Sequence, residues 1–351
     1  MRAHEVNRRL AARGVVVLQL AGAFPGARDR EVEPGYRVRH IGLRRPYPLS
    51  RLSFGLLAGR ALGRSEFDVA VVDFSVYTPV RSPSPGTPVV CVVHHLTGPW
   101  AQDRWGRLPG AMLVRHEARR LRRFSVVSAD SPATARDVRR AVAPGTAVRT
   151  IENGVDPALF TLRRAPEDPP FLLYLGRLDL YHKGLDMLLE AFARIAPHHP
   201  GLTLRIAGRG RDAEAVGALV RSSPVADRIR LLGPVTDAAK LDLLSAAAAV
   251  VMPSRMEGWG MVAAEAMAAG APLVCSNAGS LPDLVGDAAL VAPAGDVTAL
   301  VASLERILAD APLRQRLSTA GRAAARARFD WEAITTRHHD LLRSVAASSH
   351  R

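Results

Sequence analysis

The chain has 351 residues, 48% of them hydrophobic, so it is long enough for two domains with sizeable cores. Its 47 basic and 33 acidic residues give a formal net charge of +14, which fits a nucleic-acid or anionic-membrane partner. Only two of the basic residues are lysines, Lys183 and Lys240. This preference for arginine, together with abundant alanine, indicates a general composition bias, so the positive charge is weaker evidence for such a partner. Aromatic residues are only 5%, so no stacking platform for single-stranded nucleic acid is evident and no nucleic-acid partner is expected.

The two cysteines, Cys91 and Cys275, lie in apolar, strand-like runs without metal-ligand or disulfide spacing. We therefore expect buried free thiols in a reducing cytoplasm. No apolar run reaches about 18 residues, and the first residues lack the apolar segment of a signal peptide, so neither a transmembrane helix nor secretion is expected.

Helix and strand signals alternate through the first half of the chain. Helices are predicted at 4–12, 49–62, 113–123 and 131–142, and strands at 15–20, 37–41, 67–73, 89–93, 124–127 and 147–151. Ser131 is expected to cap the last of these helices, with Pro132 in its first turn.

A polar, proline-rich stretch at 163–170 separates this series from a second one. The second series has predicted strands at 171–175, 202–207, 229–232, near 250, at 273–275 and at 289–291, and helices at 184–196, 213–222, 237–247, 261–269 and from 297 onward. Alternating strands and helices predict parallel sheets with ligands at the carboxyl ends of the strands. The sequence thus predicts an α/β protein with two Rossmann-like domains, 1–162 and 171–329, facing across a cleft, with 163–170 as linker.

The stretch 250–279 carries the densest chemical signals. It reads as a buried strand, a loop with Glu257, Gly258 and Gly260, a helix that contains Glu265, and another strand. The glycines let the backbone approach a ligand and expose N–H groups, and the positive end of the helix points at the same place. Ionised carboxylates accept hydrogen bonds from sugar hydroxyls. The stretch therefore predicts a phosphate or sugar-phosphate site.

Two other interpretations of these carboxylates stay open. Glu257, at the mouth of the loop, and Glu265, about two helical turns in, could be the acid/base pair of a glycosidase. Along one helix they would lie about 12 Å apart at ~1.5 Å per residue, farther than the roughly 5–9.5 Å of a hydrolase pair. The second alternative is an ordinary βαβ turn with a solvated Glu257 and a capping Glu265.

Cations and glycines follow two other predicted strands. Gly176 and Arg177 follow one strand, and Lys183 stands at the start of the next helix, so the two cations could neutralise a departing diphosphate. Solvated surface cations are the other interpretation. A loop at Gly208 is a weaker close-approach signal.

His94 and His95 follow a buried strand, at the edge where an α/β fold places ligands. A histidine there could bind a sugar hydroxyl or handle a proton, and a structural pair is the alternative. The sequence has no Ser/His/Asp spacing, HExxH motif or Asp-x-Asp metal motif, so no metal is expected.

In combination these motifs resemble the family-4 retaining glycosyltransferases of the GT-B fold. The match covers nearly the whole chain and rests on 153–156 (NGVD), on 176–177 with 183–184, and on 257–270 (EGWGMVAAEAMAAG). The resemblance implies metal-independent, retaining transfer of a sugar from a nucleotide-diphosphate donor to an acceptor hydroxyl, with no cofactor besides this co-substrate.

The resemblance also implies roles for single residues. Arg177 and Lys183 hold the donor diphosphate, Glu257 contacts the donor sugar, and Glu265 binds the ribose hydroxyls. A histidine at the place of His94 faces the donor sugar and the acceptor. The implied catalytic residues are His94, Arg177, Lys183 and Glu257; the donor-binding residues are Gly176, Gly208, Gly258, Trp259, Gly260, Met261, Val262 and Glu265; the acceptor-side residues are His95 and Asn153.

The two ends of the chain also bear on this resemblance. Family members begin with a strand and a glycine-rich loop, whereas this chain starts at the following helix, so the N-terminal domain is expected to lack its first strand. The amphipathic stretch 330–351 matches the family's final helix, which returns to the N-terminal domain.

Three questions of partner and activity remain open from sequence. The basic helix 113–123 could face an anionic membrane that carries a lipid-linked acceptor, at the inner face of the membrane, or be a solvated helix face. The acceptor itself could be lipid-linked, a polysaccharide or a small molecule. Rival activities are a GT-B nucleotide-sugar epimerase and a non-catalytic or impaired sugar-nucleotide binder.

Overall fold

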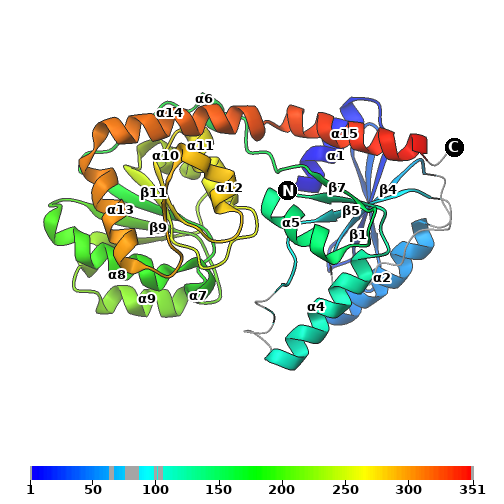
Figure 1. The fold of residues 1–351 in the computed structure, drawn as a ribbon, viewed down its shortest axis with the longest axis horizontal. Helices are drawn as coiled ribbons and strands as arrows, with labels where there is room; N and C mark the ends of the chain where they lie inside the picture. Colours follow the sequence, from blue (N-terminus) through cyan, green and yellow to red (C-terminus); the bar gives the residue numbers. More distant parts are fainter. Residues whose placement is uncertain (1, 63–66, 76–86, 99–100, 102–105, 349–351) are drawn as a thin grey trace. The chain divides into compact units, whose positions relative to one another are not determined.

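The computed structural model describes residues 2–62, 67–75, 87–98, 101 and 106–348. The chain divides into two compact units: unit 1 comprises residues 1–153 and 331–351, and unit 2 comprises residues 154–330. Parallel strands alternate with helices in each unit (Figure 1), so the predicted α/β plan with two Rossmann-like units is confirmed.

Unit 2 contains one continuous sheet of six parallel strands in the order β10-β9-β8-β11-β12-β13. Every position of the central strands β8, β11 and β12 is buried, as expected for parallel strands covered by helices on both faces. The strands are β8 (Phe171–Leu175), β9 (Thr203–Ala207), β10 (Ile229–Gly233), β11 (Ala249–Met252), β12 (Leu273–Ser276) and β13 (Leu290–Ala292).

The helices of unit 2 follow its strands in the alternating order that the sequence predicts. They are α6 (Ala158–Thr161), α7 (Leu180–Lys183), α8 (Leu185–Ile195), α9 (Ala213–Ser222), α10 (Asp237–Ala246), α11 (Met261–Ala269), α12 (Leu281–Val285), α13 (Val297–Ala309) and α14 (Ala311–Arg328), with 3-10 turns η1 (Ala196–His198), η2 (Ala226–Arg228) and η3 (Gly286–Ala288). The four-residue helix α7 is absent from the prediction, which merges it into the loop before α8.

Helix α11 is buried on nearly all sides because its side chains are small. Residues 263–269 are all buried, and five of these seven positions hold alanine. Gly260 before the helix and Gly270 after it have positive φ angles of 100° and 69°, so glycine is favoured at both ends. Helix α14 packs closely on α11 through Gly321, where an added Cβ would lie 3.4 Å from the Cα of Met267.

Unit 1 carries two separate sheets. The first has the order β1-β3-β2, with β1 parallel to β3 and β2 antiparallel to it, and the second has the parallel order β4-β5-β6-β7. In the described chain, α1 is the first element of this unit. The elements are α1 (Arg2–Ala12), β1 (Val17–Gly22), β2 (Arg30–Glu33), β3 (Tyr36–Ile41), α2 (Tyr47–Leu62), β4 (Ala70–Asp73), β5 (Val89–Val93), α4 (Arg107–Leu121), β6 (Val126–Ala129), α5 (Pro132–Ala141), β7 (Ala147–Thr150) and α15 (Trp331–Ser348).

Local signals in unit 1 explain several element ends. The hydroxyl of Ser131 accepts a hydrogen bond from the backbone N–H of Thr134 at 3.0 Å, so the predicted cap of α5 is confirmed. The thiols of Cys91 in β5 and Cys275 in β12 are buried and free, also as predicted.

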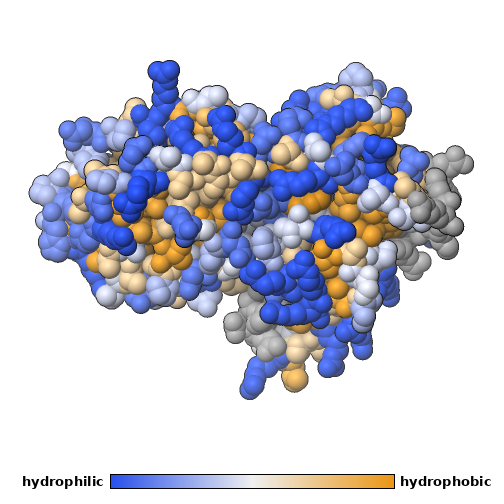
Figure 2. All heavy atoms as spheres, turned by 45° about the horizontal axis from the view of Figure 1, so that its top comes forward, coloured by the Kyte–Doolittle hydropathy of each residue, from blue (hydrophilic) through white to orange (hydrophobic). Residues whose placement is uncertain are grey.

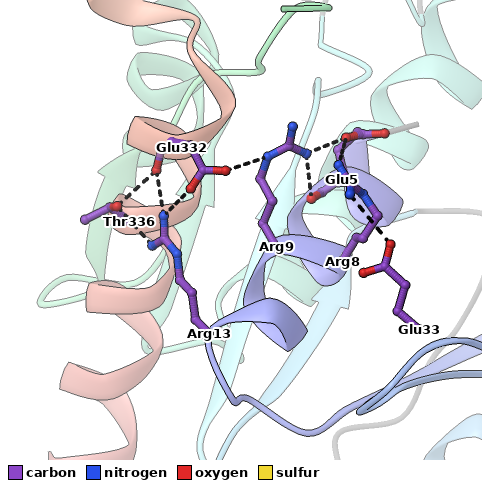
Figure 3. A network of polar contacts seen from close by, with 7 residues as sticks. All are labelled: Glu5, Arg8, Arg9, Arg13, Glu33, Glu332 and Thr336. Carbon is purple, nitrogen blue, oxygen red and sulfur yellow. Dashed lines mark hydrogen bonds and ion pairs between the residues drawn. The ribbon is translucent and has the colours of Figure 1, made fainter.

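The last helix, α15, packs on the first one, α1, within unit 1. Their apolar contact includes Leu10, Trp331 and Ile334. Beside it, the carboxylate of Glu332 receives the guanidinium groups of Arg9 at 3.1 Å and Arg13 at 2.8 Å (Figure 3). The two ends of the chain thus belong to the same unit.

The division between the units falls at residue 153, whereas the sequence placed the end of the first domain at 162 and a linker at 163–170. Residues 164–167 bond to the end of α10 and so belong to unit 2. The N–H of Ala165 donates to the carbonyl of Ser245 at 3.1 Å, and the guanidinium of Arg164 donates to the carbonyls of Leu244 and Ala247. These bonds satisfy carbonyls that the end of a helix otherwise leaves unpaired.

Candidate active site

A cavity of about 170 Å³ opens in unit 2 at the carboxyl ends of the central strands β8 and β11. This is the edge where parallel α/β sheets bind ligands. Polar and apolar side chains share its lining: Tyr174, Leu175, Gly176, Arg177, Lys183, Met252, Ser254, Glu257, Met261 and Val262. The structure therefore brings together six predicted residues: Gly176, Arg177, Lys183, Glu257, Met261 and Val262.

Lys183 and Glu257 form an ion pair at this cavity. The Nζ of Lys183 lies 2.7 Å from Oε2 of Glu257, and their side chains are only 15% and 11% exposed. The hydroxyl of Ser254 donates to the same oxygen at 3.2 Å. The pair places a cation and a hydrogen-bond acceptor next to each other in a sheltered position, which suits a ligand that carries both phosphate and hydroxyl groups.

Lys183 is positioned by the short helix α7, of which it is the last residue. The carboxylate of Asp179 caps this helix by accepting from the N–H of His182 at 3.0 Å. Gly184 ends it with a φ of 65°, and a Cβ there would overlap the carbonyl oxygen of Pro253. The loop that carries Lys183 is thereby packed against the loop that leads to Glu257.

The amino-terminal end of α11 forms one wall of the cavity, because Met261 and Val262 are its first two residues. The unpaired N–H groups and the dipole at such an end favour an anion. The loop before it is fixed from behind: the hydroxyl of Ser280 donates to the carbonyl of Gly258, and a Cβ on Gly279 would overlap the carbonyl of Glu257.

Two residues that the sequence assigned to donor binding, Trp259 and Gly208, pack against other parts of unit 2 in the structure. The indole of Trp259 is 6% exposed and stacks edge-on against Phe329 at 5.4 Å between ring centroids, so this side chain belongs to the core. Gly208 lies where a Cβ would overlap the carbonyl oxygen of Gly176, so its small size serves the contact between two loops. Neither residue is among those that line the cavity.

Glu265 has a different environment from Glu257. It is the fifth residue of α11, little more than one turn in rather than two, and it is 7% exposed. Burial raises the pKa of its carboxyl, and Lys240 of α10 opposes that rise, with its Nζ 2.9 Å from Oε1 of Glu265. Because Glu257 lies in the loop before α11, the 12 Å separation expected for both on one helix does not apply.

Unit 1 gathers charged groups around His94 at the carboxyl ends of β4, β5 and β6. The Nδ1 of His94 lies 3.4 Å from Oδ2 of Asp130, and its Nε2 lies 3.6 Å from Oδ1 of Asp73. These bonds, that to Asp130 first, raise the pKa of His94 to about 9. The imidazole is therefore a cation and a hydrogen-bond donor at neutral pH, and it is unsuited to accept a proton there.

Arg2, the first residue of α1, crosses this cluster. Its guanidinium lies 3.3 Å from Nδ1 of His94 and donates to the carbonyl of Ile151 at 2.8 Å. It also lies 3.2 Å from Nε2 of His338 in α15, whose pKa is lowered to about 3, mainly by burial and then by this arginine. At neutral pH, therefore, the imidazole of His94 is protonated and that of His338 is neutral, although both lie beside Arg2.

The two predicted acceptor-side residues occupy contrasting positions. His95 is exposed, whereas Asn153 is 6% exposed, and its side-chain oxygen has no hydrogen-bond partner among the described residues.

Sequence reasoning passed over three charged residues that the structure places beside these groups: Asp73, Asp130 and Lys240. Asp73 and Asp130 each stand at the carboxyl end of a strand, the same signal that singled out His94. Lys240 is one of only two lysines in the chain, and each lysine pairs with one of the two glutamates of the 257–270 motif.

Two family models match consecutive parts of the sequence. The model of Glycosyltransferase Family 4 matches residues 1–159, and that of Glycosyl transferases group 1 matches residues 159–324. MMP alpha-(1->4)-mannosyltransferase of Mycolicibacterium hassiacum is 30% identical over 312 residues, 84% of this chain and 74% of that protein. The chain belongs to the family-4 glycosyltransferases.

Other curated relatives of this family-4 glycosyltransferase match a shorter part of it. Glycogen synthase of Mycobacterium tuberculosis is 38% identical over 198 residues, 55% of this chain and 48% of that protein. Phosphatidyl-myo-inositol mannosyltransferase of Mycobacterium leprae is 34% identical over 180 residues, 50% of this chain and 47% of that protein. The chain thus spans about half the length of these relatives.

Solved structures confirm the GT-B fold of this family-4 glycosyltransferase. Sucrose-phosphate synthase from Thermosynechococcus elongatus aligns with 99% of this chain and 93% of its own, with a TM-score of 0.83 and 23% identity. Anabaena Alr3699/HepE in complex with UDP-glucose aligns with 88% of this chain and 86% of its own, at a TM-score of 0.70 and 20% identity. In the described part of the chain, no helix combines the length and apolar character needed to cross a bilayer.

Proposed function

We propose that this family-4 glycosyltransferase moves a sugar from a nucleotide-diphosphate donor to an acceptor hydroxyl with retention at the anomeric carbon. The observation that carries the proposal is the cavity at the start of α11, which combines the cations Arg177 and Lys183 with the carboxylate Glu257. Two relatives are named as mannosyltransferases, and a structural neighbour was solved with UDP-glucose, which supports a hexose and a nucleotide donor.

In this proposal the donor diphosphate lies against Arg177 and Lys183, and its sugar reaches Glu257. The bond between the anomeric carbon and the diphosphate oxygen breaks, and the acceptor oxygen bonds to the same face of that carbon. The acceptor proton passes to the departing phosphate. The two cations and the amino-terminal end of α11 stabilise the charge that grows on the leaving group. We propose that they make a bound metal unnecessary, so that activity should persist in the presence of a chelator.

Glu265 is proposed to bind the ribose hydroxyls of the donor. Its burial and its pairing with Lys240 support a binding role, because a proton donor or acceptor for the sugar would have to reach the cavity that Glu257 lines. The two glutamates then act on different parts of one ligand rather than as the acid/base pair of a glycosidase.

The test is a panel of UDP-, GDP-, ADP- and dTDP-sugars incubated with candidate acceptors, with products followed by proton NMR. Transfer with the donor's anomeric configuration kept supports the proposal, and an inverted product overturns the retaining mechanism. Turnover of the donor without any acceptor would indicate an epimerase or a hydrolase. Donor binding in calorimetry without turnover would indicate a non-catalytic binder.

We also propose that unit 1 makes a peripheral contact with an anionic membrane at its inner face, through the basic helix α4 that the sequence predicted at 113–123. Arg115 and Arg119 of α4 are exposed, as are Arg122 and Arg123 directly after its last residue, and clustered positive side chains are attracted to anionic lipids. The contact would bring the enzyme to a lipid-linked acceptor.

A further inference from the structure

Positive charge is distributed unequally between the two units. Residues 1–153 and 331–351 contain 28 arginines and 14 acidic residues, whereas residues 154–330 contain 19 basic and 19 acidic residues. The whole formal net charge of +14 therefore belongs to unit 1. A composition bias toward arginine acts on both units alike, so it does not account for this difference.

Helix α2 of unit 1 exposes several of its leucines. Leu49, Leu52 and Leu56 follow the spacing of one helix face and are 48%, 48% and 50% exposed. The positions that face into the unit hold small residues instead, such as Ser50 and Ala58, which are 7% and 2% exposed. A helix that only covered a core would bury its leucines, so this exposed stripe indicates a partner.

The leucine stripe is bordered by positive charge and further apolar side chains. Residues 43–62 include no aspartate or glutamate. Arg45 before the helix and Arg60, one turn beyond Leu56, are both exposed. Leu43 and Tyr47, 53% and 72% exposed, extend the apolar surface.

Helices α2 and α4 of unit 1 each send an arginine to the same residue, Ser75. Arg51 of α2 reaches the hydroxyl of Ser75 at 3.5 Å, and Arg120 of α4 donates to the carbonyl of Ser75 at 3.0 Å. Figure 1 draws both helices along one end of unit 1. At its amino-terminal end α4 exposes Leu108 and Met112, which are 80% and 73% exposed.

In the part of the chain that the structure describes, neither α2 nor α4 presents an exposed carboxylate. The one acidic residue in the sequence of α4, Glu117, is 4% exposed, and both of its oxygens accept from the backbone N–H of Thr97, at 3.1 and 3.0 Å. Figure 2 shows hydrophobic residues beside hydrophilic ones on the end of unit 1 that carries α4.

We propose that α2, together with α4, is the docking surface of this protein for an anionic phospholipid bilayer, with the leucine stripe of α2 inserted among the lipids. Leu49, Leu52 and Leu56 enter the boundary between headgroups and acyl chains, as the apolar face of an interfacial helix does. Arg45, Arg60 and the arginines of α4 contact the lipid phosphates. The proposal rests on the membrane contact proposed for α4, adds the leucine stripe of α2 to it, and does not depend on which sugar is transferred.

Two other partners fit the surface less well. Nucleic acid would use the arginines, but its phosphates offer nothing to a stripe of half-exposed leucines. A second copy of the chain would cover the leucines but would bring together two units that each carry the full excess of positive charge.

The test is sedimentation of the full-length protein with phosphatidylcholine vesicles, with or without phosphatidylglycerol. We expect binding only to the anionic vesicles. The double variant Leu52→Gln and Leu56→Gln should lose about tenfold or more in affinity, because two apolar side chains no longer enter the lipid. Raising the salt concentration should weaken wild-type binding as well. The matched control is Leu219→Gln with Leu231→Gln in unit 2, whose leucines are 40% and 42% exposed, and which should bind like the wild type.

The donor assay separates this proposal from the transfer reaction. The glutamine variants should keep their circular dichroism and their turnover of soluble donor and acceptor. A wild-type protein that ignores anionic vesicles at low salt overturns the proposal, and so does a leucine variant that binds as tightly as the wild type. If duplex DNA abolished vesicle binding, and the leucine variant still bound vesicles, the surface would be a nucleic-acid surface instead.

Discussion

The two units repeat one architecture but stabilise it by different means. In unit 2, six parallel strands form one sheet and its central strands are buried at every position. In unit 1, the strands are divided between a sheet of three and a sheet of four, and Leu18 of β1 and Val71 of β4 are 37% and 51% exposed. Both residues lie in edge strands, and the division into two sheets gives the described part of unit 1 four edge strands, whereas the single sheet of unit 2 has two.

The two groups of candidate site residues reflect that difference. In unit 2 the loops around the cavity are fixed by backbone packing, with Gly184, Gly208 and Gly279 at positions where no Cβ fits. In unit 1, His94 is held by carboxylates from the ends of neighbouring strands. The loops of unit 2 should therefore tolerate added side-chain atoms poorly, whereas the stability of the site in unit 1 should depend on pH.

The largest expected effect is a loss of transfer activity when the ion pair between Lys183 and Glu257 is broken. Lys183→Ala removes the cation next to Glu257 and leaves a carboxylate that is only 11% exposed without that partner. If Lys183 stabilises the leaving diphosphate, kcat/KM for sugar transfer should fall by about 10²- to 10³-fold. The control is Arg194→Ala, which removes an exposed pair with Glu190 in the same unit and should leave kcat/KM unchanged. A Lys183→Ala enzyme with an unchanged kcat would contradict the proposed role.

A large loss of stability is expected at the packed glycines of unit 2. Gly208→Ala would overlap the carbonyl of Gly176 and should destabilise unit 2 by about 3 kcal/mol or more. In unit 1, Gly145 also has a positive φ, of 84°, but nothing lies within 4 Å of an added Cβ, so Gly145→Ala should cost about 1 kcal/mol. Urea unfolding followed by hydrogen exchange of peptides from each unit measures both. Equal losses for the two variants would refute the contrast in packing.

A moderate effect is expected at the second lysine. Lys240→Ala removes the cation that opposes the raised pKa of the buried Glu265 carboxyl. A carboxylate that is more readily protonated accepts fewer hydrogen bonds from ribose, so nucleoside-diphosphate affinity should fall about tenfold. Calorimetry with a 2′,3′-dideoxy nucleotide provides the control, because a ligand without the hydroxyls should lose little. Equal losses for both nucleotides would assign Lys240 to another part of the ligand.

Local sequence signals predicted most of the fold. Helix α11 begins and ends where the prediction placed it, because Gly260 and Gly270 mark both of its ends and an apolar, alanine-rich run fills it. Strand β2 was missed because its sequence, REVE, alternates charged residues with a single valine. The division of unit 1 into two sheets depends on pairing between distant strands, which local patterns do not report.

The candidate site was predictable where a motif is continuous in sequence and less so where partners are distant. Lys183 and Glu257 were singled out separately, but their contact joins residues 74 positions apart. Trp259 stands inside the motif, yet its indole packs on Phe329, which only the folded chain brings near. Asp130 carried a strand-end signal, but its effect on His94 follows from its burial at 2% exposure.

The smallest and most specific effect is expected from the pH response of unit 1. His94 has a pKa raised to about 9 from 6.5, chiefly by Asp130 and then by Asp73. Its protonated form therefore stabilises unit 1 fully below pH 6.5, and this contribution is lost as the pH rises through about 9. Relative to His94→Gln, wild-type unit 1 should lose stability across this pH window, as measured by hydrogen exchange of its peptides.

An NMR titration of His94 tests the cause of this response. Asp130→Asn should lower the pKa of His94, whereas Asp137→Asn, which changes an exposed acid on α5, should not change it. An imidazole that titrates near 6.5 in the wild type would show that the carboxylates of unit 1 do not hold His94 as a cation.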